Sequence, residues 1–377
     1  MAASMSCGGA AGPSCAPWSL DTLSVHGRLP AERSSPGWRP EEALSLRLSG
    51  HWIWDFWFAT EGEDVHVFYL HAPRDLGHPD LRHSHAQIGH AVSRDLRSWE
   101  VLPTALSPGP PGAFDDLATW TGSILEAGGR WHLFYSGIST RGDGRVQRVG
   151  LATSEDLRRW ERQPVLVEAD PRWYETRRDH SDGEETWRDP WVFRDPADGR
   201  FHMVVCARVN HGPPDGRGVL GHAWSTDLRS WEAGPPLSEP GEFRQLEVPQ
   251  VVRLGGTWRA IFSAGWSDHS AARLARSGVV AEGGTHYLVG GGPLGPYALD
   301  RDEFLLGDAQ VSFYAGRVVR HRGAWWLLAW RHADGRGRFF GELSDPMALT
   351  VDQAGSLWVS DSPLGARQAP AADREPG

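Results

Sequence analysis

The sequence predicts an all-β protein built as a five-bladed β-propeller. A short motif that recurs at blade-length intervals, a series of hydrophobic hairpin arms and an unusual composition lead to this prediction. The chain holds 20 Trp and 45 Gly among its 377 residues. Trp anchors strands with a large apolar surface and Gly closes tight turns, so this composition indicates many short strands. We find no pattern with the period of a long amphipathic helix.

The recurring motif is Asp-Leu-x-x-Trp. It ends at Trp99, Trp160 and Trp231, so that 61 and 71 residues separate its copies. Each copy follows a strand-like stretch and lies downstream of a hydrophobic arm, over 65–70, 131–136 and 201–207. A unit of about 60 residues with about four strands has the size of one propeller blade. The Asp can close a turn while Leu and Trp pack between sheets, so we interpret the motif as scaffold.

Two further units keep the hairpins but lack the motif. In one, 248–254 and 258–263 flank a Gly-Gly turn, and in the other, 310–319 and 325–330 flank an Arg-Gly turn. These units bring the count to five blades.

The predicted boundaries follow from where these units begin and end. We expect an irregular N-terminal tail over residues 1–45 and a catalytic propeller over residues 46–360. A Pro/Ala-rich and disordered C-terminal tail is expected over residues 361–377.

The composition is that of a globular protein, with 40% hydrophobic and 23% charged residues and a mean hydropathy of −0.43. No apolar run is long enough to cross a membrane. The start of the chain lacks a basic segment followed by an apolar one, so we expect a cytoplasmic location. The net charge of −10 argues against a nucleic-acid partner. The three cysteines lack ligand spacing, so we expect no disulfide framework, metal or cofactor.

Three carboxylates stand in apolar or aromatic surroundings. They are Asp55 in the run 51–58, Asp189 in Trp187-Arg188-Asp189-Pro190-Trp191, and Glu247 in Leu246-Glu247-Val248-Pro249. A buried acid has to be hydrogen-bonded, paired or functional, because an isolated charge is costly there. The intervals are 134 and 58 residues, close to two blades and one blade. If each acid lies at an equivalent point of an innermost strand, the three meet at the central funnel.

Two carboxylates that flank an anomeric carbon can cleave a glycosidic bond, since one attacks or activates water and the other protonates the leaving oxygen. A third can hold ring hydroxyls and stabilise the positive charge of the transition state. The sugar would then lie against aromatic walls, for which the chain offers Trp54, Trp57, Trp120, Trp187 and Trp191. The expected substrate is therefore a small-molecule glycoside or an oligosaccharide.

Four segments carry a resemblance to a known family: Gly89-His90-Ala91 with the first Asp-Leu-x-x-Trp, Trp120-Thr121-Gly122-Ser123, Arg188-Asp189-Pro190, and Glu247-Val248-Pro249. The chain resembles the propeller of the β-fructosidase superfamily, glycoside hydrolase family 32 with its relatives in family 68. The resemblance implies that Asp55 is the nucleophile, Asp189 the transition-state stabiliser and Glu247 the general acid/base. It also implies a sugar pocket that includes Trp54, Trp57, Asp116, Trp120, Ser123, Arg188 and Trp191.

The sequence departs from the family pattern at two points. The nucleophile motif usually reads Asn-Asp-Pro-Asn-Gly, whereas here it is Trp54-Asp55-Phe56-Trp57, closer to the levansucrase branch. After the fifth unit we expect no room for the C-terminal β-sandwich that is usual in family 32.

Several polar residues have two interpretations. His78, His83 and His85 lie in one Pro/Gly-rich loop, where we favour a solvated or rim position over a metal site. Asp115 and Asp116 either bond substrate hydroxyls or cap a turn. Arg188 either meets a sugar hydroxyl, which we favour, or pairs with neighbouring acids.

The expected function is that of a retaining glycosidase acting on β-fructofuranosides such as sucrose, fructo-oligosaccharides or fructans. One alternative keeps the fold but inverts the anomeric centre, as in propeller arabinofuranosidases or xylosidases, whose carboxyl groups stand farther apart. The other alternative is a carbohydrate-binding propeller without catalysis.

Overall fold

The structure is a computed structural model that describes residues 44–177, 183–333, 338–360 and 364. The chain divides into two compact units, 1–38 and 39–377, and the first unit lies outside the described residues. So do nearly all residues of the two predicted tails.

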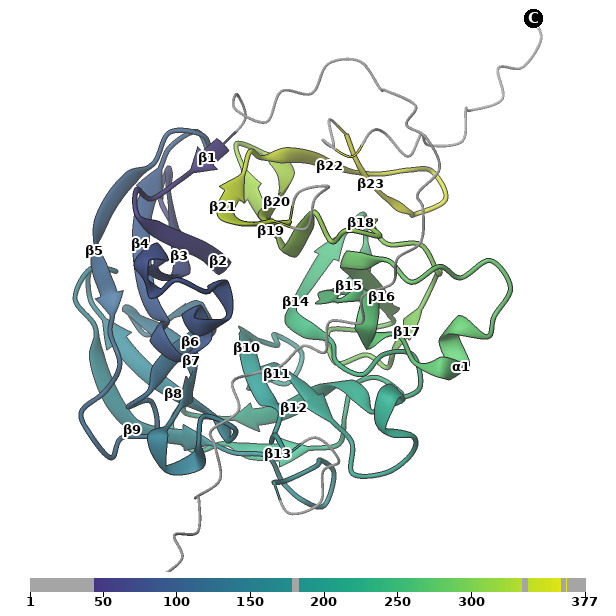
Figure 1. Ribbon diagram of the computed structural model, residues 1–377, viewed down its shortest axis with the longest axis horizontal. Helices are drawn as coiled ribbons and strands as arrows, with labels where there is room; N and C mark the ends of the chain where they lie inside the picture. Colours follow the sequence, from purple (N-terminus) through teal and green to yellow (C-terminus); the bar gives the residue numbers. More distant parts are fainter. Residues whose placement is uncertain (1–43, 178–182, 334–337, 361–363, 365–377) are drawn as a thin grey trace, which may run out of the picture. The chain divides into compact units, whose positions relative to one another are not determined.

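Five antiparallel sheets follow one another along the second unit and are arranged in a ring (Figure 1). The predicted all-β, five-bladed propeller is thereby confirmed. Blade I contains β2 (His51–Glu61), β3 (Asp64–Pro73), β4 (Gln87–Ser93) and β5 (Glu100–Leu106). Blade II contains β6 (Ala118–Ala127), β7 (Arg130–Ile138), β8 (Gln147–Ser154) and β9 (Glu161–Val167). Blade III contains β10 (Trp187–Arg194), β11 (Phe201–Arg208), β12 (Gly218–Ser225) and β13 (Glu232–Gly234).

The last two blades are less regular. Blade IV contains β14 (Glu247–Leu254), β15 (Thr257–Ala264), β16 (Gly283–Gly290), β17 (Tyr297–Leu299) and β18 (Leu306–Asp308). Blade V contains β19 (Phe313–His321), β20 (Ala324–Ala333), β21 (Phe339–Ser344), β22 (Met347–Val351) and β23 (Leu357–Val359). Its outer strand β21 pairs with β1 (Leu44–Leu46), so an N-terminal strand completes the last blade.

The Asp-Leu-x-x-Trp motif forms the same turn in each of the first three blades. In blade I, Oδ1 of Asp95 accepts the backbone N–H groups of Arg97 and Ser98 at 2.8 and 2.7 Å. Leu96 is buried in the left-handed region at φ 62°, and its equivalents Leu157 and Leu228 share that conformation. The motif therefore serves the scaffold, as its composition predicts.

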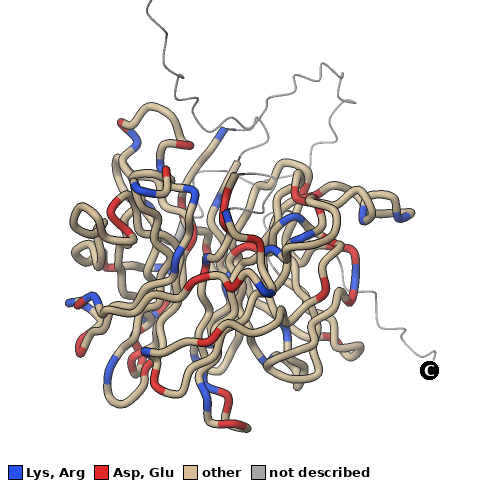
Figure 2. The backbone as a smooth tube through the Cα atoms, turned by 90° about the horizontal axis from the view of Figure 1, so that it is seen from below, with Lys and Arg blue, Asp and Glu red and all other residues tan. Residues whose placement is uncertain are grey.

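Apolar side chains fill the spaces between neighbouring blades. Phe68 of blade I, for example, is fully buried and meets Trp160 of blade II edge-on at a centroid distance of 5.7 Å. Acidic and basic residues are interspersed along the strands and loops (Figure 2). Among the described residues, no helix is long and apolar enough to cross a membrane, and the single α-helix, α1, covers only Ala271–Leu274.

The innermost strands β2, β6, β10, β14 and β19 each lose register against their neighbour once, at a corresponding level. The breaks lie between Trp54 and Phe56, Thr119 and Gly122, Arg188 and Trp191, Glu247 and Gln250, and Tyr314 and Arg317. Such β-bulges turn side chains away from their regular alternation. Asp189, Val248 and Ala315 occupy the left-handed region at three of these breaks, with φ of 59°, 52° and 49°. In every blade, therefore, the side chains of the innermost strand change direction at one level of the ring.

Buried histidine pairs within two blades should make the protein sensitive to acid. His66 Nδ1 lies 2.8 Å from His90 Nε2, and His202 Nδ1 lies 3.0 Å from His222 Nε2. Burial, and then the neighbouring histidine, lowers the pKa of His90 to about 3 and that of His222 to about 4.

We predict that the free energy of unfolding falls as the pH drops from about 6.5 toward 4. Over this range the histidines of the unfolded chain become protonated, whereas the buried histidines of the folded chain stay neutral because their pKa values are depressed. His90 and His222 should each cost about 3 kcal/mol at pH 4, since both pKa values lie about 2.5 units or more below that of the unfolded chain. Urea unfolding from pH 8 to 4 measures the slope. His222→Gln should flatten it and the exposed-site control His78→Gln should not; a slope that His222→Gln leaves unchanged would contradict the assignment.

Candidate active site

Asp55 lies at the register break of β2 and is half-buried. Its Oδ2 accepts a hydrogen bond from Thr121 Oγ1 of β6 at 2.8 Å, and its Oδ1 accepts one from Trp330 Nε1 of β20 at 3.1 Å. Burial, and then the nearby charges of Asp189 and Glu247, raises the pKa of Asp55 to about 7. Residues of blades I, II and V thus hold one carboxyl group that is partly protonated and partly ionised near neutral pH.

Asp189 lies at the corresponding break of β10 and is buried. Its Oδ2 accepts the backbone N–H of Val248 at 3.0 Å, and its own N–H donates to Ser136 Oγ at 2.8 Å. Ser136 in turn donates to the carbonyl of Thr121 at 3.1 Å, which links the surroundings of Asp189 and Asp55. Burial raises the pKa of Asp189, and the charge of Arg188 opposes this rise.

Glu247 is the first residue of β14 and directly precedes the break. Its Oε2 accepts a hydrogen bond from the Tyr314 hydroxyl at 2.5 Å, and its Oε1 pairs with Arg188. Tyr314 lies opposite Trp330 in the β19–β20 pair, and Trp330 is the donor to Asp55. Glu247 and Asp55 are therefore held by two adjacent aromatic side chains of blade V.

The three predicted acids do meet at the axis, from blades I, III and IV. Their register differs slightly from the prediction of equivalent points. Asp55 and Asp189 lie within the breaks of their strands, whereas Glu247 lies one residue earlier and corresponds to Arg188 and Tyr314.

Arg188 is engaged by the protein's own acids and amides. It is buried and contacts Glu247 and Gln245, Gln147 Oε1 at 3.2 Å and Asp189 Oδ2 at 3.5 Å. The pairing with acids, which the sequence argument ranked below a sugar contact, is what the structure shows. Arg188 thereby holds Asp189 and Glu247 at a fixed separation.

Trp54 and Trp120 face a common neighbour, His83. The imidazole ring lies 6.2 Å from Trp54 and 6.1 Å from Trp120, both edge-on, and the His83 carbonyl accepts Trp120 Nε1–H at 2.8 Å. The 3-10 helix Pro79–His85 also places the Arg82 guanidinium 5.6 Å above Trp54. Asp55 and Glu247 act electrostatically on this buried guanidinium, so the segment borders the acids.

His78 and His85 do not join His83. His78 accepts the N–H of Asp80, and His85 Nδ1 lies 2.8 Å from the Leu81 carbonyl. The three loop histidines therefore have separate partners, and only His83 reaches the aromatic rim of the site.

Three residues expected near the sugar belong to the scaffold instead. Trp57 is fully buried in the inter-blade core. Ser123 Oγ accepts the N–H of Val192 at 3.0 Å and ties β6 to β10. Asp116 accepts the N–H groups of Gly112 and Thr140 at 2.7 and 2.8 Å, which lower its pKa to about 2. Asp116 thus caps a loop. Trp191 is half-buried, and its ring lies 5.5 Å from the Arg317 guanidinium carbon.

Sequence reasoning missed several residues around the acids. Tyr314 and Trp330 belong to the fifth unit, which has no Asp-Leu-x-x-Trp motif and no axial acid to draw attention to it. Asp268 follows β15; burial, and then the charge of Glu247, raises its pKa to about 6. Neighbouring Trp266 is 58% exposed. Tyr314 occupies the position on β19 that Glu247 occupies on β14, but a search for acids passes over a tyrosine. Trp330 and Asp268 enter the site from a hairpin partner and a loop, which the spacing of the axial acids does not indicate.

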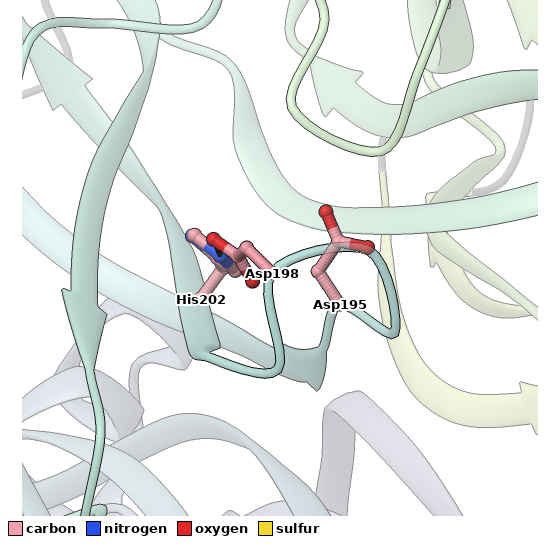
Figure 3. Close-up of side chains that lie close together, drawn as sticks. All are labelled: Asp195, Asp198 and His202. Carbon is pink, nitrogen blue, oxygen red and sulfur yellow. Dashed lines mark hydrogen bonds and ion pairs between the residues drawn. The ribbon is translucent and has the colours of Figure 1, made fainter.

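A separate cluster of possible ligand atoms lies at the β10–β11 turn: Asp195, Asp198 and His202, within 4.8 Å of one another (Figure 3). Asp195 Oδ1 accepts the N–H of Ala197, and Asp198 accepts the N–H of Arg200 and lies 3.1 Å from His202 Nε2. These bonds account for the cluster as a turn, and we assign no metal to it.

Comparisons with known proteins agree with this geometry. A family model described as "Glycosyl hydrolases family 32 N-terminal domain" matches residues 58–332. A raffinose invertase of Escherichia coli is 29% identical over 226 residues, 57% of this chain and 42% of that protein. A sucrose-6-phosphate hydrolase of Escherichia coli is 29% identical over 215 residues, 55% of this chain and 39% of that protein. The chain thus spans less than half the length of either relative.

Among solved structures, the chain is similar to an inulosucrase from Halalkalicoccus jeotgali bound to kestose. The TM-score is 0.68 at 23% identity, covering 83% of this chain and 87% of that one. At this identity the likeness concerns the fold.

We predict that Thr121→Val raises the pKa of Asp55 above its value of about 7. The hydroxyl of Thr121 donates to the ionised carboxylate, so its loss favours the protonated form, by about half to one pH unit. Carboxyl ¹³C NMR titration, assigned with Asp55→Asn, gives the value. Thr119→Val is a matched control, because Thr119 is buried on the same strand but bonds the Ala86 carbonyl. A pKa that stays or falls in Thr121→Val would refute the role of this hydrogen bond.

Proposed function

The chain belongs to glycosyl hydrolase family 32, and from this membership and the axial acids we propose that it is a retaining glycosidase of β-fructofuranosides. The observation that carries the proposal is the convergence of Asp55, Asp189 and Glu247 at one level of the ring, each with a different set of partners. Different surroundings let three like groups take three roles. The proposed substrates are sucrose, fructo-oligosaccharides or fructans.

Asp55 is the proposed nucleophile. Thr121 and Trp330 donate to its two oxygens and favour the ionised form that can attack the anomeric carbon. Burial, and then the charges of Asp189 and Glu247, raises its pKa to about 7, so that a part of the molecules carries the ionised form at neutral pH. The attack forms a fructosyl ester on Asp55 while the bond to the leaving oxygen breaks.

Glu247 is the proposed acid and base. In the first step its proton passes to the leaving oxygen, and in the second it removes a proton from the water that releases fructose. Tyr314 donates to one oxygen of Glu247 and Arg188 to the other, which fixes the carboxylate when it is ionised. Tyr314 and Trp330 are neighbours, so the carboxyl groups of Glu247 and Asp55 are held by adjacent side chains. We expect the two carboxyl groups to flank one glycosidic bond, as the retaining mechanism requires.

Asp189 is the proposed transition-state stabiliser. It is anchored by the N–H of Val248 and lies beside Arg188, so its orientation does not depend on substrate. A fixed negative charge beside the ring stabilises the developing oxocarbenium ion without reorganisation. Trp120 and His83 are the proposed walls for the sugar, and the buried Trp54 packs edge-on against His83.

We predict that the wild type releases fructose from a panel of sucrose, sucrose-6-phosphate, raffinose, kestose, inulin and levan. Asp55→Asn should lower turnover by about 10⁴-fold or more while sugar binding persists, because the isosteric amide cannot form the ester. The control is Asp198→Asn, in the exposed turn that joins β10 to β11, and it should keep full turnover. Arabinose release from aryl arabinofuranosides in place of fructose would reject the proposed substrate, and binding without turnover would reject the enzyme.

A second prediction separates the role of Glu247 from that of Asp55. Glu247→Ala should lose far less activity on an aryl β-fructofuranoside with an acidic phenol than on sucrose, because that phenol leaves without a proton. Asp55→Ala should lose activity on the aryl substrate and on sucrose to the same extent. The anomer first released, read by ¹H NMR, should be β; initial release of the α-anomer would show inversion.

A further inference from the structure

Arg317 lies where four blades meet. It follows the register break of β19 in blade V and is fully buried. Its Nε donates to the Phe56 carbonyl of blade I at 3.3 Å, and one Nη donates to the Pro249 carbonyl of blade IV at 2.5 Å. Its guanidinium carbon lies 5.5 Å from the ring centre of Trp191 in blade III. No other contact described above joins so many blades through one side chain.

The carbonyls that Arg317 bonds stand next to the acids. Phe56 directly follows Asp55, and Pro249 lies two residues after Glu247. Trp191 lies two residues after Asp189. One guanidinium therefore bonds the backbone just beyond Asp55 and Glu247 and lies against the side chain of Trp191, just beyond Asp189.

The charge of Arg317 is not neutralised by a direct ion pair among the described residues. Its other Nη is buried and has no hydrogen-bond partner there. A buried cation that bonds only neutral carbonyls is costly. The anions that act on it are Asp189 and Asp55, which offset that cost through space.

We propose that Arg317 is a positioning residue for the catalytic acids: it bonds the strand segments that follow Asp55 and Glu247, packs against Trp191 beyond Asp189, and offsets the negative charge of Asp189. The inference rests on the function proposed above for these acids, but its physical content concerns the unliganded protein. The charged and titratable groups that face Asp189 are Arg188 on its own strand, Asp55 on β2, Cys206 on β11, Glu247 on β14 and Arg317 on β19. Of the two cations, Arg188 pairs directly with both Asp189 and Glu247, whereas Arg317 makes no direct ion pair among the described residues and acts on Asp189 and Asp55 through space.

Arg259 supplies a matched comparison. It is equally buried, on β15, and bonds the carbonyls of Leu254 and Gly355 beneath the ring of Tyr287. None of the axial acids is among the groups that act on it. Its replacement should affect stability without affecting the acids.

The first test is a double-mutant cycle on stability, which needs no substrate. If Arg317 offsets the charge of Asp189, then Arg317→Gln should lower the melting temperature less in an Asp189→Asn background than in the wild type. The cycle of Arg259→Gln with Asp189→Asn should be additive. If Arg317→Gln alone does not fold, recovery of a folded Arg317→Gln/Asp189→Asn protein supports the proposal, and failure of both to fold overturns it. Strict additivity also overturns it.

The second test measures the acid directly. Carboxyl ¹³C NMR should show the pKa of Asp189 rising by about one pH unit in Arg317→Gln and staying in place in Arg317→Lys and Arg259→Gln. At pH values below the pKa of Asp189, the kcat/KM of Arg317→Gln for fructose release should be about tenfold lower than that of the wild type. At higher pH the difference should disappear, and KM should change little at either pH. An unmoved pKa with a lower melting temperature would leave Arg317 a scaffold residue and refute the proposal. A wild type that releases no fructose would reject the proposed function, yet the cycle and the titration would still decide on Arg317.

Discussion

The register break in each innermost strand is the constraint on which this site depends. A regular strand would alternate its side chains between two faces, and both faces here are packed against neighbouring blades. The break releases one or two residues from that alternation at a common level. Asp55, Asp189 and Glu247 occupy this level in three blades, while Thr121 and Tyr314 occupy it in the other two. The three candidate acids, with Thr121 and Tyr314, thus lie at or directly beside one repeated distortion.

Gathering three carboxylates raises their free energy, and the surrounding blades offset this with donors and cations. Each acid accepts hydrogen bonds from a different blade than its own, so the site is also a set of contacts that join the ring. Arg82, Arg188 and Arg317 place positive charge on different sides of the group. Burial still dominates for Asp55, whose raised pKa leaves it poised between its two protonation states at neutral pH. The same desolvation strengthens every electrostatic interaction with a bound sugar.

The sequence predicted the blades and the acids because both repeat. The Asp-Leu-x-x-Trp turn recurs with the period of a blade, and the spacing of Asp55, Asp189 and Glu247 follows that period. The sequence does not show which residues of a strand face the axis and which pack in the core, because the register breaks do not alter the hydrophobic pattern in a recognisable way. Trp57 was therefore assigned to the pocket, although it lies two residues past the break and packs on Phe68. Tyr314, Trp330 and Arg317 were missed because their importance arises only when the fifth blade meets its neighbours, blade IV for Tyr314 and blade I for Trp330 and Arg317.

The pairing of β1 with β21 has a consequence for how this chain reaches its native state. Leu44 pairs with Ser344, so the last blade is finished by a strand that leaves the ribosome long before its partner. The first four blades can form their hairpins locally as they are synthesised, but the circle stays open until the end. Until then the outer edge of β21 and the facing sides of blades I and V are exposed to wrong partners. The native surroundings of Asp55 are complete only after that last event, because Trp330 of blade V reaches Asp55 of blade I only when the ring has closed.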